Sequence, residues 1–335
     1  MSGQALKMRA SRDMAKKLRW FDKGAEAFQR TFPDALAFLG GNPPPHYVCP
    51  ECAEPDESGR TYRIRLLPRL ALASGDLTAE HVPPKSFGGR PLVLTCKSCN
   101  DFAGHQLDAH ARKRENPGDA LLGATRKPSR VAVTMGEHTV AASLEVDPGM
   151  LDLTRPPLSK NANDPRALPP FWEALRHSAA GQPTLHLAFS GDLHEPRRAR
   201  VSWLRHAYLA LFAVAGYRYI FQPGLGIVRR QIKEPDVEHI PLFLAALPEH
   251  RPWTEKCIIH VHEPEWLRCW AVQFGSYLVF LPRPGDGEFY SRIAQQARLS
   301  GHGTDFSGDL VDWPTEPLFG LDMPQGAAAR PLPGR

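Results

Sequence analysis

The sequence predicts an α+β protein in which a small N-terminal module precedes a larger α+β domain. Three observations lead to this prediction: two pairs of closely spaced cysteines, a strand–loop–strand–helix pattern between and after them, and later strand-like segments around one long apolar helix. The chain has 335 residues, of which 42% are hydrophobic, so it can bury the core of one large domain or of two ordinary ones. Its 33 prolines predict many loops and few long helices.

The distribution of apolar residues argues against a membrane-spanning or secreted protein. The richest apolar stretch, residues 207–220, is interrupted by Arg218 and is too short to cross a bilayer. The basic first 20 residues lack an apolar segment followed by a small-residue cleavage site, so they do not form a secretory signal. We therefore expect a cytoplasmic protein with no membrane partner.

Positive charge is concentrated in the first part of the chain. Residues 1–130 hold 21 Lys and Arg against 14 Asp and Glu, a net charge of +7, whereas residues 131–335 carry −2. Basic residues crowd residues 7–19 and 112–130, which is expected of a phosphate-binding surface or of a solvated helix face. Residues 1–30 fit a basic amphipathic helix that either packs on the module and lies along nucleic acid or forms a solvated leader.

Four of the six cysteines form two C-x-x-C pairs, separated by 43 residues. Two residues between thiolates let one tight turn present both sulfurs to a tetrahedral zinc ion, and two such knuckles complete a closed site. A disulfide would require an oxidising compartment, and one redox-active pair would not explain why the motif occurs twice. We therefore predict a structural Zn²⁺ at Cys49, Cys52, Cys96 and Cys99, and interpret Cys257 and Cys269 as buried apolar residues.

The segment before and after the second knuckle predicts a compact ββα unit. Residues 77–82 read as a strand that ends at two prolines, and residues 92–95 as a second strand after a loop at Gly88 and Gly89. Residues 98–114 read as a helix. A unit this small cannot bury an adequate core by itself, so zinc would supply much of its folding free energy.

These residues resemble the HNH endonuclease family, in its form with two zinc knuckles around a ββα-metal fold. The resemblance covers about residues 45–115 and rests on Glu80-His81-Val-Pro-Pro, Gly88-Gly89, residues 92–96 and Cys99-Asn100. It implies hydrolysis of phosphodiester bonds in nucleic acid, DNA rather than RNA, with one divalent cation, Mg²⁺ or Mn²⁺. By analogy, it also suggests a role in host defence or in a mobile element.

The resemblance assigns a role to each matching residue. His81 corresponds to the general base, and Glu80 and Asn100 correspond to ligands of the catalytic cation. The position of the family's middle asparagine is Pro91 here. Neighbouring strand residues point to opposite faces, so Glu80 and His81 converge on one phosphate only where the backbone is irregular. His105 is a further catalytic candidate, which Asp108 could orient from the same helix face.

Neutral imidazole and oxygen ligands suit this chemistry. An imidazole near pH 7 can accept a proton from the attacking water. A hard cation such as Mg²⁺ prefers oxygen ligands. The alternative is a non-catalytic zinc module that binds nucleic acid or a protein partner, with Pro91 marking the loss of activity.

The remaining chain predicts an α+β domain of unknown role. We predict a basic helix at 1–30, the HNH module at 31–125, the α+β domain at 130–315 and a flexible tail at 316–335, with a protein partner or a second copy bound through the α+β domain. The predicted elements are a hairpin at 130–135 and 138–146, a core helix at 199–219, and strands at 184–189, 242–247, 257–262 and 277–281. His260 and His262 share a strand face, but no acidic residue of fitting spacing lies near them, so a second metal site is not predicted.

Overall fold

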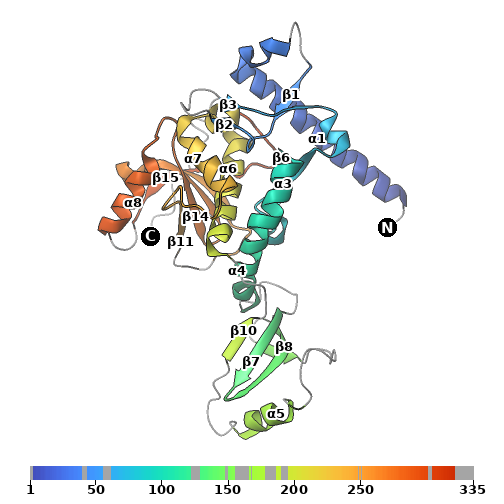
Figure 1. Cartoon of the computed structure of the whole chain (residues 1–335), viewed down its shortest axis with the longest axis vertical. Helices are drawn as coiled ribbons and strands as arrows, with labels where there is room; N and C mark the ends of the chain where they lie inside the picture. The colour runs from blue at the N-terminus through green and yellow to red at the C-terminus, as the bar shows by residue number, and fades with distance from the viewer. Residues whose placement is uncertain are drawn as a thin grey trace. The chain divides into compact units, whose positions relative to one another are not determined.

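The chain forms two compact units, each of which mixes helices and strands (Figure 1). The computed structural model describes residues 3–39, 44–55, 62–121, 129–147, 150–154, 166, 168–177, 186–189, 195–247, 249, 251–300 and 304–320. The first unit comprises Met1–Asp108 and Arg197–Arg335, and the second comprises Ala109–Pro196. The α+β class is therefore confirmed. The units do not follow the predicted boundary near residues 125–130, because the last part of the chain packs with the first.

The N-terminal half of the first unit consists of helices and three small antiparallel sheets. Each sheet has two strands, and the pairs are β1 with β4, β2 with β3, and β5 with β6. The elements are α1 (Gly3–Thr31), η1 (Pro33–Leu39), β1 (His46–Val48), β2 (Glu54–Pro55), β3 (Tyr62–Arg63), β4 (Leu66–Pro68), α2 (Ala71–Ser74), β5 (Leu77–Val82), η2 (Lys85–Phe87) and β6 (Arg90–Cys96).

Helix α1 packs on the module through apolar residues of its C-terminal half. Trp20, Phe21 and Phe28 are buried, and the Phe21 ring meets the ring of Tyr47 on β1 with centroids 6.1 Å apart. The predicted amphipathic helix is confirmed, and its packing favours the interpretation as part of the module over a solvated leader. None of the helices in the described residues combines the length and apolar character needed to span a bilayer.

The β5–β6 hairpin matches the predicted strand pair and contains the irregularity that the sequence required. Glu80 pairs with Val93 but His81 pairs with Pro91, so one residue of β6 bulges out between them. Gly89 explains the tight loop, because a Cβ there would lie 1.6 Å from the carbonyl oxygen of Pro83. The bulge and the loop together determine the backbone conformation around His81.

The predicted helix 98–114 is interrupted. Helix α3 (Lys97–Ala103) is followed by a π-helical segment, η3 (Gly104–Asp108), and then by α4 (Ala109–Leu121). A π turn is wider than an α turn and shifts the direction of the side chains that follow it. The expectation of one regular helix is therefore wrong at this point, with consequences for Asp108.

Helix α6 (Pro196–Ile220) is buried along most of its length within the first unit. This confirms the predicted core helix at 199–219. It bends at Gly216, whose φ of 69° is accessible mainly to glycine. The hydroxyl groups of Tyr208 and Tyr217 donate to the carbonyl oxygens of Pro50 and Val48, at 2.7 and 2.8 Å. These bonds tie the last part of the chain to the first cysteine pair, which explains the composition of the unit.

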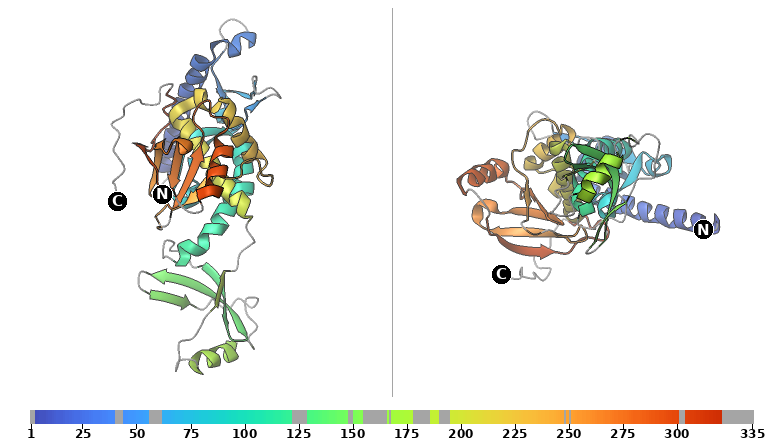
Figure 2. Two further views of the ribbon diagram at one scale, coloured as in Figure 1. Left: turned by 90° about the vertical axis from the view of Figure 1, so that its left-hand side faces the viewer. Right: turned by 90° about the horizontal axis from the view of Figure 1, so that it is seen from below.

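The rest of the first unit is a five-stranded antiparallel sheet flanked by short helices (Figure 2). Its strand order is β11-β14-β13-β12-β15. Three strands were predicted, whereas β13, β15 and the helices α7 and α8 were not. Cys269 is buried as predicted, and Cys257 is half-buried. The elements are η5 (Pro223–Leu225), α7 (Gly226–Lys233), β11 (Leu244–Ala246), β12 (Lys256–Glu263), η6 (Glu265–Leu267), β13 (Cys269–Phe274), β14 (Tyr277–Leu281), α8 (Phe289–Ser300) and β15 (Ser307–Val311).

Part of the predicted flexible tail is bound to α6. The backbone N–H groups of Leu318 and Phe319 donate to the carbonyl oxygen of Ala213, and the Phe319 side chain is buried. Phe319 lies against Gly216, where a Cβ would be 3.2 Å from its backbone. Residues 316–320 are thus held in place by an aromatic anchor, and residues 321–335 lie outside the described part of the chain.

The second unit is a four-stranded antiparallel sheet of order β10-β7-β8-β9, with helix α5 packed on β7 and β8. Val131, Leu144 and Phe171 belong to its core. The predicted hairpin around residues 136–137 is confirmed. The elements are β7 (Ser129–Met135), β8 (His138–Asp147), β9 (Met150–Thr154), α5 (Leu168–His177) and β10 (His186–Phe189).

Candidate functional site

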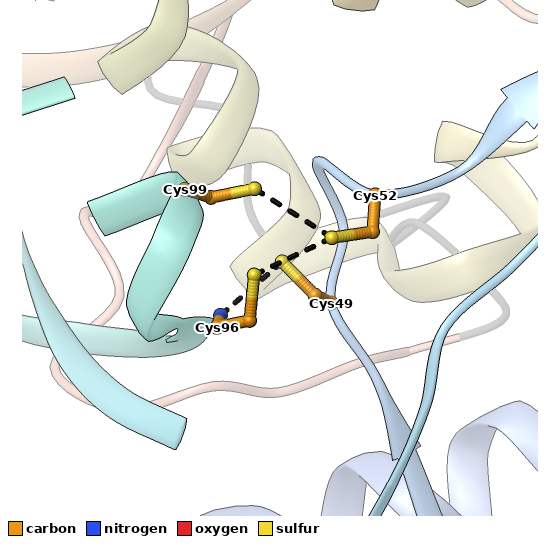
Figure 3. A group of neighbouring side chains, drawn as sticks. All are labelled: Cys49, Cys52, Cys96 and Cys99. Atoms are coloured by element: carbon orange, nitrogen blue, oxygen red, sulfur yellow. Dashed lines mark hydrogen bonds between the residues drawn. The ribbon is translucent and has the colours of Figure 1, made fainter. Parts of the chain in front are cut away.

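The four predicted cysteines converge on one point (Figure 3). All four sulfurs lie within 4.8 Å of one another, and all are free thiols rather than disulfides. The Sγ of Cys52 is 3.4 Å from that of Cys96 and 3.6 Å from that of Cys99. One pair comes from the turn after β1, and the other comes from the junction of β6 and α3.

This cluster has the donors and the spacing for a tetrahedral zinc ion. Zn–S bonds of about 2.3 Å in tetrahedral geometry separate neighbouring sulfurs by about 3.8 Å. The backbone N–H of Cys96 also donates to the Sγ of Cys49 at 3.3 Å, which suits a sulfur that carries negative charge. The four cysteines could therefore hold zinc, as predicted.

A buried cation connects the first knuckle to the strand that carries His81. The side chain of Arg205, from α6, is fully buried. Its guanidinium donates twice to Glu51, at 2.8 Å for each bond, and once to Oε2 of Glu80 at 2.9 Å. Glu51 lies inside the first C-x-x-C pair, so one guanidinium links the knuckle with the residue before His81.

The charges in this network stabilise one another. Burial alone would lower the pKa of Arg205, but Glu51 and Glu80 raise it well above its usual value. Burial raises the pKa of Glu51, and the guanidinium only partly opposes that rise. Glu80 is 6% exposed in its side chain, and its Oε1 accepts the backbone N–H of His81 at 3.1 Å. The carboxylate of Glu80 is therefore shared between the backbone of His81 and Arg205, and its role as a ligand of the catalytic cation stays a prediction.

His81 presents an imidazole that no described residue holds by a hydrogen bond. The residue is half-buried at the end of β5, next to the bulge. Burial lowers its pKa, the charge of Glu80 raises it, and the charges of Lys85 and His206 lower it further, with a lowered pKa as the net result. The neutral form of the ring, which can accept a proton, is therefore favoured near pH 7.

A second histidine, His206, lies near His81. It was not among the site residues predicted from the sequence. His206 follows Arg205 on α6 and is fully buried, with its Nε2 3.1 Å from Oδ1 of Asp108. Ser202 donates to the same carboxylate oxygen at 2.6 Å. Burial would raise the pKa of Asp108, but His206, Arg205 and Ser202 outweigh it and lower the pKa. Within the described residues, Nδ1 of His206 is buried without a hydrogen-bond partner.

Asp108 therefore orients His206 rather than His105, which corrects the sequence prediction. The π turn moves Asp108 off the face that a regular helix would give it. His105 is exposed, and its Nδ1 lies 2.8 Å from the backbone carbonyl oxygen of Asp101. A catalytic role for His105 stays a prediction. Within the described residues, its hydrogen bond is with Asp101 rather than with His81.

Asn100 lies beside the strand that carries Glu80. Its Nδ2 donates to the Thr78 hydroxyl at 2.8 Å, two residues before Glu80 on β5. This bond fixes the orientation of the amide and leaves its oxygen atom as the one that a cation could bind. The side chain is half-buried, so Asn100 and His81 are both accessible in part.

The sequence did contain a signal for Arg205 and His206. They are adjacent polar residues in a helix that is otherwise apolar, and buried charges in such a position require partners. The partners Glu51, Glu80 and Asp108 lie about 100 to 150 residues earlier in the chain. Spacing along the sequence could not identify them.

Comparison with known proteins supports the resemblance. The HNH endonuclease family model matches residues 71–116, which hold the β5–β6 hairpin, the second cysteine pair and α3. Cys49 and Cys52 lie outside the matched segment, although their sulfurs complete the cluster. No curated protein and no solved structure gives a significant match to the chain. The HNH match points to nuclease activity in general, and hence to a nucleic-acid substrate and a metal ion.

Proposed function

We propose that the protein is a metal-dependent HNH-type endonuclease that hydrolyses phosphodiester bonds in nucleic acid, with DNA as the preferred substrate. The observation that carries the proposal is the placement of His81 inside the HNH-matched segment. Its imidazole lies at a bulge beside Glu80, is partly accessible, and has no hydrogen-bond partner in the described residues.

His81 would act as the general base. Its lowered pKa keeps the ring neutral at pH 7, so it can take a proton from the attacking water. Asn100 and Glu80 would hold a Mg²⁺ or Mn²⁺ ion through oxygen atoms, which are the donors that hard cations prefer. When bound, that ion would neutralise charge on the phosphate oxygens. Oε1 of Glu80 would be the ligand atom, because it accepts only the backbone N–H of His81 whereas Oε2 pairs with the guanidinium of Arg205.

The remaining features fit this function. The zinc cluster would hold the hairpin and α3 together as a structural site. Exposed basic residues of α1, such as Arg12 and Arg19, provide charge for a nucleic-acid backbone. We place the nuclease chemistry in residues 31–125 of a cytoplasmic protein, and assign the choice of substrate or partner to the C-terminal α+β part, as in defence or mobile-element nucleases.

The test is cleavage of labelled double- and single-stranded DNA and RNA with Mn²⁺ by the zinc-loaded full chain and its His81→Ala variant. The variant should cut at least about 100-fold more slowly, because general-base catalysis contributes about 10²–10⁴-fold. A matched control is His138→Ala, which removes a half-buried imidazole from the second unit and should cut normally. Equal cutting by wild type and His81→Ala, or cutting by neither, would contradict the proposal.

Two observations favour the alternative, a non-catalytic zinc module that binds nucleic acid or protein. The carboxylate of Glu80 is engaged by Arg205 and nearly buried, and Pro91 occupies the position of the family's middle asparagine. The alternative predicts binding of DNA in a mobility-shift assay that His81→Ala leaves unchanged, with no cleavage under any metal condition.

A further inference from the structure

A second group of potential metal ligands lies on the five-stranded sheet, in the C-terminal part of the chain. His260 and His262 are two residues apart on β12, so strand alternation places them on one face. Asp309 lies on the neighbouring strand β15, directly opposite His260 in the antiparallel register. One ligand atom from each of the three residues lies within 4.8 Å of the others. The structure thus supplies the acidic partner that the sequence analysis did not find.

Packing on three strands holds these side chains in place. The His260 ring stacks on Trp270 of β13, with centroids 4.2 Å apart and planes 13° apart. The rings of His260 and His262 are 4.3 Å apart. Gly308 lets β15 approach closely, because a Cβ there would lie 2.4 Å from the carbonyl oxygen of His260. The donors are therefore brought together by the fold rather than by chance contact of long side chains.

We propose that His260, His262 and Asp309 bind one divalent transition-metal ion of the Zn²⁺ type, with the remaining coordination position open to water. Two imidazoles and one carboxylate suit Zn²⁺, Co²⁺ or Ni²⁺ better than Mg²⁺ or Ca²⁺. Three protein ligands leave a position free, as in catalytic rather than structural zinc sites. This site is separate from the four cysteines, so the chain would hold two zinc-type ions of different chemistry.

The His262–Asp309 pair needs only a small adjustment to accept the ion. Nε2 of His262 now lies 2.7 Å from Oδ2 of Asp309. Metal–ligand bonds of about 2.0–2.2 Å in tetrahedral geometry separate two ligand atoms by roughly 3.4 Å. The pair would open by less than about 1 Å, and the metal would replace the hydrogen-bonded proton between them.

Accessibility and charge define what kind of site this is. The side chains of His262 and Asp309 are 41% and 47% exposed, so an ion could enter and leave. Arg283 lies near enough for its positive charge to act on His260, which opposes a cation. We therefore expect an exchangeable ion, held less tightly than zinc in the buried cysteine cluster.

The experiment starts from full-length protein whose cysteine cluster is zinc-loaded and whose weaker sites are emptied by dialysis. Titration with Co²⁺, followed by visible absorption, should show one ion per chain with no thiolate-to-metal charge-transfer band. His262→Ala and the near-isosteric Asp309→Asn should each weaken this binding by at least about 10-fold, since even partners behind the ligands are worth about 10–100-fold. Circular dichroism would verify that both variants are folded.

Two controls separate this site from others in the chain. His239→Ala removes a histidine that also pairs with a carboxylate, Glu234 at 2.6 Å, and should bind Co²⁺ normally. Glu80→Gln removes a ligand of the proposed nuclease cation and should leave the same absorption bands in place. Absence of any Co²⁺ uptake by the wild type, or uptake that His260→Ala and His262→Ala do not change, would overturn the proposal. Neither result would depend on whether the protein cuts DNA.

Discussion

The two clusters of metal-ligand type differ in burial. The cysteine cluster is built from two knuckles, with Cys49 and Cys96 fully buried. The histidine–aspartate cluster lies on an open sheet face, where nearly half of Asp309 is exposed. Both are assembled from parts of the chain that are more than 40 residues apart.

Burial separates a structural metal site from an exchangeable one. A closed four-sulfur site replaces a hydrophobic core that the ββα unit is too small to form, so loss of its ion should unfold the unit. An open site on a sheet that already has its own core contributes little to folding.

Cys96→Ser should have the largest effect. The variant should lose its tightly bound zinc and about 5 kcal/mol or more of stability, since the metal supplies folding free energy to the module. Zinc analysis and thermal unfolding would measure both. The matched control is Cys257→Ser, a half-buried cysteine outside the cluster. A Cys96→Ser protein that kept its zinc and its melting temperature would contradict the contrast.

Arg205→Met should cost about 3–5 kcal/mol in urea unfolding, because it leaves two buried carboxylates without their cation. Adding Glu51→Gln and Glu80→Gln should recover much of that loss. Arg69→Met provides the exposed comparison, since its ion pair with Asp22 is about half exposed and should be worth about 0–1 kcal/mol. If Arg205→Met and Arg69→Met lowered the free energy of unfolding by similar amounts, burial would not determine how much these ion pairs contribute to stability.

Gly89→Ala and Gly308→Ala test the close backbone approach in the β5–β6 hairpin that carries His81 and at the histidine–aspartate cluster. Both should cost about 1–3 kcal/mol through overlap with backbone atoms, measured by chemical unfolding. Only Gly308→Ala should also weaken the Co²⁺ binding described above, because it separates β15 from His260. If Gly89→Ala had that effect instead, the β5–β6 hairpin and the histidine–aspartate cluster would not be independent.

Lowering the pH should destabilise the first unit by protonating the carboxylate of Asp108. Its pKa is lowered in the folded state, so its contribution to stability is present above the unfolded pKa of about 3.9 and is lost as the pH falls through the folded pKa. Unfolding of wild type and Asp108→Asn in urea from pH 7 to pH 3 would show this. The wild type should lose more stability over that range than the variant, and parallel curves would be the contrary result.

His262→Ala without added metal should have the smallest effect, within about 0.5 kcal/mol of wild type by urea unfolding. Its side chain is 41% exposed, and its bond to Asp309 is a surface interaction. A loss as large as that for Arg205→Met would mean that the open cluster is part of the fold's core.

Local patterns predicted the elements that carry the proposed chemistry. Strand β5 was predicted to the residue, because its pattern depends on neighbours a few positions apart. Each cysteine pair has an equally local spacing, and the matching zinc chemistry of the two pairs predicted that they meet in one cluster. Strand alternation predicted an irregular backbone at Glu80 and His81, and a register shift lies there, with the extra residue on β6. The convergence of the two side chains on one phosphate stays a prediction.

The missed features depend on distant parts of the chain. Arg205 reaches residues 154 and 125 positions earlier, and Asp309 pairs with a strand 47 positions earlier. No spacing rule connects such residues. The π turn before Asp108 was missed for a different reason, since its sequence reads as ordinary helix and tertiary bonds to Ser202 and His206 favour the wider turn.

The 125-residue separation between Glu80 and Arg205 also matters during synthesis. At about 5–20 residues per second, a ribosome needs roughly 6–25 s to make the intervening chain. Throughout that interval the nascent chain has the carboxylates of Glu51 and Glu80 but not their cation, and the first knuckle lacks the hydroxyl groups of α6. The site around His81 therefore matures only after most of the chain has been translated, so a prematurely terminated product would carry the HNH-matched segment without the helix that completes it.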